Sequence, residues 1–115
     1  MKPIPASLAV TPSTTITNNL TRIGMKFNVP TEFSNYKYYG RGPFENYSDR
    51  NTAALIDVYE TTVDAIDGEN KYVKPQENGN RTDVRWAAVT NDAGIGFMVA
   101  AQEDMNSSVS RYSIN

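Results

Sequence analysis

The sequence predicts an all-β protein, folded as an antiparallel β-sandwich. Several segments alternate apolar and polar residues as strands do, and turn residues separate them at intervals of about 8 to 12 residues. The sequence carries neither an internal repeat nor a heptad pattern. At 115 residues the chain has room for one domain with one modest core.

The first predicted strand follows a proline-rich start. Residues 1–19 hold three of the six prolines and many Ser, Thr and Asn residues, which suits a linker or an edge-strand lead-in. Residues 20–29 alternate regularly and are predicted to form a half-buried strand. The apolar side chains on its buried side are Ile23, Met25, Phe27 and Val29. The sandwich domain itself is predicted to span residues 20–115.

The middle of the chain gives one clear strand and one ambiguous segment. Residues 36–39 are rich in tyrosine and predict a strand that stops at the turn residues 40–43. Residues 51–66 mix near-helical spacing with strand-forming residue types, and we interpret them as a short helical turn followed by a strand.

The second half of the chain is predicted to be β-rich. A turn is expected at 67–70, a polar loop at 75–80, and a strand at 81–90. Residues 91–94 then close a hairpin onto a strand at 95–101. We expect one more strand over residues 109–112.

Composition excludes several classes of function. The chain has no histidine and no cysteine, which removes imidazole and thiolate ligands and nucleophiles from this sequence. The net charge is -2 and the basic residues are scattered, so we expect neither a nucleic-acid partner nor a membrane partner. No metal site is predicted.

Two pairs of carboxylates are available for glycosidic hydrolysis, which needs an acid and a second carboxylate about 5 to 9.5 Å apart. These pairs are Glu45 with Asp49, and Glu77 with Asp83. Both occur in polar loops, where carboxylates usually accept hydrogen bonds from turn amides or pair with arginine. We predict no catalytic residue in this chain, and no catalytic activity of the chain alone.

The segment 76–86 combines amide, carboxylate and guanidinium groups next to an indole, which is a combination that sugar-binding sites use. The candidate carbohydrate-binding residues are Glu77, Asn78, Arg81, Arg85 and Trp86. The alternative is a structural loop that leads into a strand, in which Trp86 faces the core with its alternation partners Val84 and Ala88. The second interpretation is favoured for Trp86.

The segment 40–50 is the other dense polar patch. We interpret it as a rigid structural loop, in which the two arginines bridge the two carboxylates. Its predicted members are Arg41, Glu45, Asn46, Asp49 and Arg50.

Both patches resemble a known family. Residues 39–50 are similar to the "YGRGPxENYxDR" signature, and residues 74–86 to the "PQENGNRTDVRW" signature, of the small-chain domain of bacterial β-galactosidases of glycoside hydrolase family 2. Residues 22–25 also fit, in order and at compatible spacing. The resemblance covers residues 20–115 and corresponds to the N-terminal part of that C-terminal domain.

The resemblance implies a truncated supersandwich related to the galactose mutarotase fold. It also implies hydrolysis of terminal β-D-galactosides by a whole enzyme whose retaining two-glutamate site lies in a (β/α) barrel outside this chain. No catalytic residue is carried over. The chain needs no cofactor of its own, and the resemblance leaves open Mg²⁺ and Na⁺ for the whole enzyme.

Three kinds of partner follow. The chain is expected to pack against the remaining domains of the enzyme and to meet galactoside substrate only through them. A truncated sandwich would also expose open strand edges, from which we predict self-association. The sequence leaves open the cytoplasm and the periplasm of a bacterium.

Overall fold

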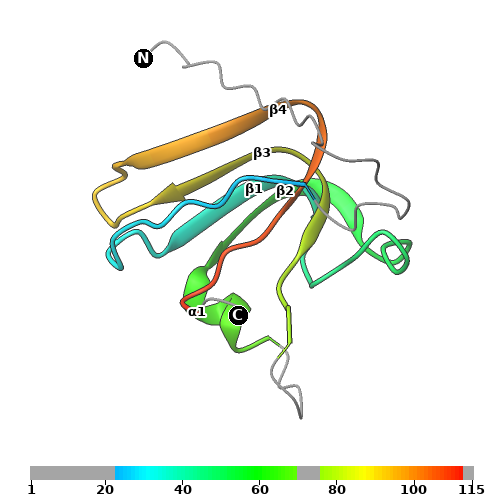
Figure 1. Ribbon diagram of the computed structural model, residues 1–115, viewed down its shortest axis with the longest axis horizontal. Helices are drawn as coiled ribbons and strands as arrows, with labels where there is room; N and C mark the ends of the chain where they lie inside the picture. Colours follow the sequence, from blue (N-terminus) through cyan, green and yellow to red (C-terminus); the bar gives the residue numbers. More distant parts are fainter. Residues whose placement is uncertain (1–22, 70–75, 113–115) are drawn as a thin grey trace, which may run out of the picture.

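The chain forms one antiparallel sheet of four strands in the order β2-β1-β3-β4 (Figure 1). The computed structural model describes residues 23–69 and 76–112. The strands are β1 (Asn35–Gly42), β2 (Leu55–Thr62), β3 (Arg81–Thr90) and β4 (Gly96–Ser107). The all-β class is therefore confirmed. Within the described ranges there is no second sheet, so the sandwich stays a prediction.

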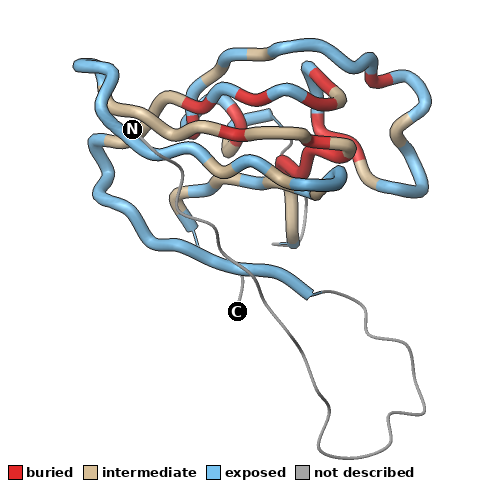
Figure 2. Tube along the Cα trace, turned by 90° about the horizontal axis from the view of Figure 1, so that it is seen from above, coloured by how far each residue is buried: buried red, intermediate tan, exposed pale blue. Residues whose placement is uncertain are grey.

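The core lies on one face of this sheet, which we call the inner face. Tyr36 and Tyr38 of β1 are fully buried there, with their rings stacked at a centroid distance of 5.1 Å. Val84 and Ala87 of β3 and Ile66 of the short helix α1 (Val63–Asp67) complete the cluster. Figure 2 shows the buried positions gathered in this part of the molecule.

The pairing of β3 with β4 is irregular just before Trp86. Two positions of β3, from Val84 to Trp86, correspond to five positions of β4, from Met105 to Ala100. Beyond this irregular stretch Ala87 lies opposite Tyr38, and Trp86 lies opposite Tyr39. Directly opposed residues point to the same face, and neighbours along a strand to opposite faces.

Trp86 is thus half-buried on the face opposite the core, which we call the outer face. The prediction that Trp86 faces the core with Val84 is wrong. Simple alternation from Val84 fails here because the strand pairing is irregular between Val84 and Trp86, so the two residues do not share a face.

The order of helix and strand in 51–66 is the reverse of the predicted one. Strand β2 comes first, and α1 follows it directly. Thr62 caps α1, because its side-chain oxygen accepts a hydrogen bond from the Ala65 N–H at 3.2 Å. The near-helical spacing of apolar residues across 55–66 therefore misled the prediction, and β-branched residue types were the better guide to the strand.

The predicted first strand is absent from the described part of 20–29. Residues 23–32 carry no strand and are exposed throughout, and Figure 2 shows them set apart from the buried positions. Phe27 makes an edge contact with Phe97 of β4, with ring centroids 6.1 Å apart. Alternation alone does not make a strand, since backbone groups also need a neighbouring strand. The lead-in 1–19 lies outside the described residues.

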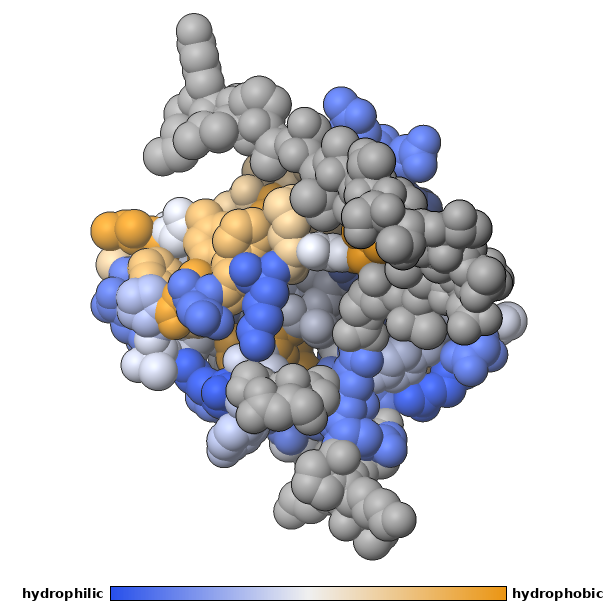
Figure 3. Space-filling model, in the orientation of Figure 1, coloured by the Kyte–Doolittle hydropathy of each residue, from blue (hydrophilic) through white to orange (hydrophobic). Residues whose placement is uncertain are grey.

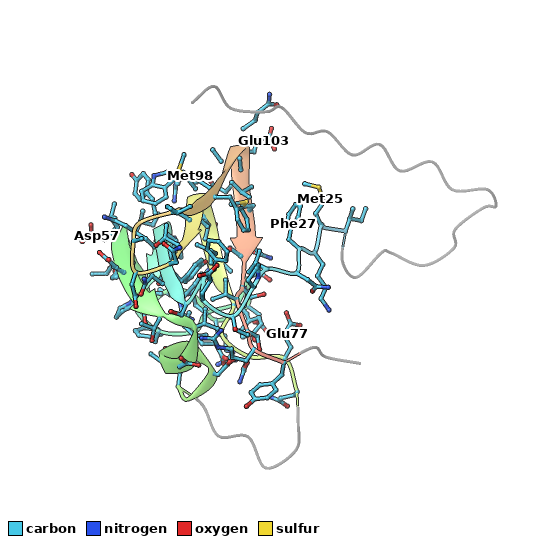
Figure 4. All side chains as sticks on the ribbon, turned by 90° about the vertical axis from the view of Figure 1, so that its left-hand side faces the viewer. Met25, Phe27, Asp57, Glu77, Met98 and Glu103 are labelled. Atoms are coloured by element: carbon cyan, nitrogen blue, oxygen red, sulfur yellow. The ribbon has the colours of Figure 1, made fainter. Side chains whose placement is uncertain are left out.

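The segment 23–29 crosses the inner side of the sheet. Figure 3 shows an apolar patch on the side of the molecule that Figure 1 turns to the viewer. Met25 and Phe27 lie on that side of the sheet, whereas Met98 of β4 lies on the other (Figure 4). Met25 and Phe27 remain 56% and 59% exposed, so the inner face carries exposed apolar surface next to its core.

The strand predicted over 109–112 is likewise absent. The Arg111 side chain instead binds the Asp64 carboxylate of α1 through Nε at 3.0 Å and Nη2 at 3.2 Å. Its Nη1 donates to the Thr31 carbonyl at 2.8 Å. This segment is thus held by an ion pair with a helix and not by strand pairing.

The other β predictions are confirmed. Strand β3 has the predicted bounds, and β1 contains the predicted 36–39. The Asn91 side-chain oxygen accepts from Ala93 N–H at 3.0 Å and Ile95 N–H at 2.9 Å, which shapes the predicted hairpin turn. Strand β4 runs to Ser107 and is longer than the predicted 95–101.

Candidate functional site

The two signature segments meet in space as two facing loops. The Asn46 N–H donates to the Asn80 carbonyl at 2.9 Å, and the Asn80 side-chain amide donates to the Asn46 carbonyl at 2.9 Å. Both asparagines are buried. Residues far apart in the sequence therefore form one polar network, which we call the loop junction. Its buried polar side chains are Glu45, Asn46, Asn80, Arg81 and Thr82.

Glu45 is the carboxylate of the loop junction. One oxygen accepts from Arg50 at 2.7 Å, and the other accepts from the Gly79 N–H at 2.6 Å. Its backbone N–H donates to Glu69 at 3.1 Å. Glu45 is only 5% exposed, so its carboxylate joins the two loops inside the protein and is not presented to solvent.

The Asn46 side chain is fully buried and bonded at both ends. Its NH₂ group donates to the carbonyls of Arg41 at 3.0 Å and Phe44 at 2.8 Å. Its oxygen accepts from the Thr82 N–H at 3.0 Å and the Thr82 hydroxyl at 2.5 Å. Asn46 therefore fixes the shape of its own loop and attaches it to β3.

Arg81 lies at the centre of the loop junction and is 1% exposed. Its Nε donates to the Tyr38 hydroxyl at 2.9 Å, and its Nη2 donates to the Pro43 carbonyl at 2.9 Å and to Glu69 at 3.2 Å. Its Nη1 donates to the Gly79 carbonyl at 3.1 Å. The guanidinium thus links β1, both loops and the end of α1.

The remaining loop residues show which of the expected bridges exist. Arg50 pairs with Glu45, whereas Arg41 pairs with Asp83 and also donates to the Ala54 carbonyl at 2.8 Å. Asp49 is exposed. The bridging that we expected inside 40–50 therefore extends to β3, where Asp83, at φ 53°, pairs with Arg41.

Burial raises the pKa values of the two core tyrosines beside the loop junction. It raises the pKa of Tyr36 to about 12, although the hydrogen bond to Ser107 at 2.9 Å acts in the opposite direction. Burial also raises the pKa of Tyr38, against the opposing charge of Arg81. Both phenols are therefore neutral hydrogen-bonding groups near neutral pH.

Two of the candidate sugar-binding residues lie together on the outer face. Trp86 is half-buried beside Tyr39, and the Arg85 guanidinium lies 5.4 Å from the centroid of the Tyr39 ring. Arg85 also pairs with Asp104 at 3.4 Å. The other candidates are divided between places, since Arg81 is buried while Glu77 and Asn78 lie in the loop before β3 at intermediate burial.

Three members of the loop junction were not predicted from the sequence. Glu69, Asn80 and Thr82 supply hydrogen bonds to it, although none was singled out as a structural residue. For Asn80 and Thr82 a signal existed, because both belong to the second signature segment. Glu69 follows the end of α1 in the predicted turn, but no local pattern predicted its contacts with Glu45 and Arg81.

The polar side chains of the loop junction form hydrogen bonds with one another and with nearby backbone groups. Each buried side-chain nitrogen and oxygen of the described residues has a hydrogen-bond partner. The described ranges contain no cluster of three or more acidic residues suited to a metal ion. Nor do they contain a helix long and apolar enough to cross a membrane.

The chain matches a family model described as "Beta galactosidase small chain" over residues 4–115. It is 47% identical over 77 residues to a β-galactosidase of Priestia megaterium, and 46% over 76 residues to one of Bifidobacterium adolescentis. These alignments cover 67% and 66% of this chain but 7% of each relative. A β-galactosidase of Lactobacillus delbrueckii subsp. bulgaricus is 34% identical over 82% of this chain, which is 9% of that protein.

The match with the family model covers nearly the whole chain, including both segments of the loop junction. The chain therefore belongs to the β-galactosidase small-chain family.

Proposed function

We propose that this chain is a non-catalytic structural domain of a β-galactosidase that hydrolyses terminal β-D-galactosides. In this proposal it packs against the catalytic barrel of the enzyme and helps to shape the substrate cleft. The relatives named above are β-galactosidases, of which the matched part is 7 to 9%. The small share is what one supporting domain of a large enzyme would occupy.

The observation that carries the proposal is the inward direction of the loop-junction side chains. Glu45, Asn46 and Arg81 are 5%, 0% and 1% exposed, and each binds groups of the protein itself. A catalytic acid must reach a glycosidic oxygen, and a sugar-binding fork must reach hydroxyl groups. Groups that are buried and fully bonded serve instead to hold loop shape.

Turnover of a chromogenic galactoside by the 115-residue chain tests the proposal. We expect none, because the Glu45 carboxylate is buried and is occupied by Arg50 and Gly79. Turnover that is lost in Glu45→Gln or Glu77→Gln would overturn the proposal.

A chimera tests the supporting role directly. Residues of this chain can replace the matched 77-residue segment of the Priestia megaterium β-galactosidase. The chimera is expected to stay active, and Arg81→Met within it to lower thermal stability more than kcat at low temperature. A loss of kcat in a variant that keeps the thermal stability of the parent chimera would contradict a purely structural role.

The outer face favours a second candidate, which is a carbohydrate-binding module acting through residues 76–86. A binding module needs an accessible aromatic group, and Trp86 lies outside the core beside Tyr39, which is 37% exposed. Arg85 and Asp104 next to it offer hydrogen-bonding groups.

A titration with galactose and with lactose, followed by NMR at the Trp86 indole, separates the two candidates. Saturable indole shifts, accompanied by shifts of the backbone amides of residues 76–86 that disappear in Trp86→Ala, would support the binding module. Unchanged spectra up to high sugar concentration would leave the structural domain.

A further inference from the structure

The outer face of the sheet carries an apolar row that crosses all four strands. The strand pairing places Val58, Tyr39, Trp86 and Ala100 side by side in the order of the strands. Val58 is 48% exposed, and Met98 in the next row is 63% exposed. A sheet face of this composition is normally covered by another layer of protein.

The described residues leave this face open. Ile66 of α1 and Val109 belong to the packing of the inner face. The segment that carries Met25 and Phe27 also lies on the inner side, and Met98 lies on the opposite side of the sheet (Figure 4). Residues 23–69 and 76–112 thus provide cover for the inner face and not for the outer face.

The side chains at the centre of the outer face are of the kinds that anchor protein interfaces. Tyr, Trp and Arg dominate the binding energy of such contacts, usually near the middle of the interface. Here Trp86 and Tyr39 are neighbours, and Arg85 lies against the Tyr39 ring. Because Arg85 occupies that ring face, the row suits a broad protein surface better than one stacked sugar ring.

The charges around the row are self-complementary. On one side of it Lys37 pairs with Glu60 at 3.9 Å, and on the diagonally opposite side Arg85 pairs with Asp104 at 3.4 Å. Consider two copies of the chain that meet through their outer faces. A two-fold axis that lies in the plane of contact, perpendicular to the line joining the two pairs, places each pair of one copy opposite the other pair of the second copy. Lys37 then meets Asp104, and Glu60 meets Arg85, so an isologous contact matches opposite charges.

We propose that the outer face binds the outer face of a second copy of this chain, forming a two-fold dimer centred on Tyr39 and Trp86. The low net charge of -2 opposes such association only weakly. This proposal concerns the 115-residue chain itself, and it neither requires nor excludes the supporting role in a larger enzyme.

Sedimentation equilibrium of Met98→Lys and Met25→Lys tests the proposal with matched variants. Both residues are exposed methionines, at 63% and 56%, and they lie on opposite sides of the sheet. The parent chain is expected to dimerise, and Met98→Lys to weaken the dimer by about tenfold or more, because it places a charge in an apolar contact. Met25→Lys should leave the dimer constant within about twofold.

Several results would overturn the proposal. A parent chain that is monomeric at its highest soluble concentration would do so. So would a dimer that resists Met98→Lys in a folded variant, or one that Met25→Lys disrupts, since the latter places the contact on the inner side. Amide NMR spectra establish that each variant is folded.

Charge reversal gives a second test that does not touch the apolar row. Lys37→Glu would place a carboxylate opposite Asp104 and weaken the dimer about tenfold, and adding Asp104→Lys should restore most of the loss. Lys26→Glu makes the same change of net charge on the exposed segment 23–32 and should have little effect. Equal effects of Lys37→Glu and Lys26→Glu, or no recovery in the double variant, would contradict the proposed pairing.

Discussion

The Glu45 carboxylate accepts a hydrogen bond from the backbone N–H of Gly79, a residue 34 positions later, at 2.6 Å. The same carboxylate accepts from Arg50 at 2.7 Å. One buried side chain thus joins the two signature segments, and the stability of the protein should depend on it.

Glu45→Gln is expected to lower the free energy of unfolding by about 1 to 3 kcal/mol. An amide keeps one acceptor oxygen but loses the charge that strengthens both hydrogen bonds, and it leaves Arg50 or Gly79 poorly matched. Urea unfolding of dilute protein measures the change. Glu60→Gln is the control, because Glu60 is exposed and pairs with Lys37 only at 3.9 Å. A loss no larger than that of the control would show that Glu45 does not stabilise the loop junction.

Gly79→Ala is expected to destabilise the protein by about 1 to 3 kcal/mol more than Gly94→Ala. Both glycines have positive φ, at 74° and 80°, so the backbone strain of an alanine is similar in the two. A Cβ atom at Gly79 would collide with the Ile66 side chain, whereas one at Gly94 meets nothing within 4 Å. Thermal unfolding of the pair isolates the collision, and equal losses would mean that Ile66 moves aside without cost.

Much of the sheet was predictable, because β3 and the following hairpin depend on local signals. The strand bounds Arg81 and Thr90 follow from alternation and from the turn at 91–94. The face of Trp86 was not predictable, since the irregular stretch between Val84 and Trp86 belongs to the pairing with β4, which a local pattern does not report.

The strand prediction for residues 23–29 failed for a different physical reason. Their alternation is as regular as that of a true strand, but no described strand pairs with them. To bury that apolar side, the segment would need another part of the protein to pack against. A local sequence pattern does not show whether such a surface exists. The candidate site likewise has contacts that local sequence predicts and contacts that depend on the fold. Glu45 and Arg50 are five positions apart and could be paired from the sequence. Glu69 and Arg81 are brought together only by the fold.

Arg81→Met is expected to cost about 2 to 4 kcal/mol of folding free energy. Methionine fills much of the same volume but leaves the Tyr38 hydroxyl and the Pro43 carbonyl without their partner. The lower part of this range allows for Glu69, which is partly exposed and can regain water. Chemical denaturation gives the value, with Arg85→Met as the matched control. Arg85 is 36% exposed in its side chain, so its loss should cost less than about 1 kcal/mol.

Tyr36 should make the protein lose stability in alkali. Burial raises its folded-state pKa from 10.0 to about 12, so the folded state holds a proton that the unfolded state releases first. This contribution is fully present below pH 10 and is lost as pH rises towards about 12, amounting to about 2 to 3 kcal/mol.

Urea unfolding across this pH range should therefore show a downward slope that Tyr36→Phe reduces. The variant also loses the hydrogen bond to Ser107, so its stability at neutral pH should fall by about 1 kcal/mol. Tyr112→Phe, at a residue 77% exposed, is the control and should keep the slope. If Tyr36→Phe and the parent chain lost stability in parallel above pH 10, another group would be responsible for the alkaline transition.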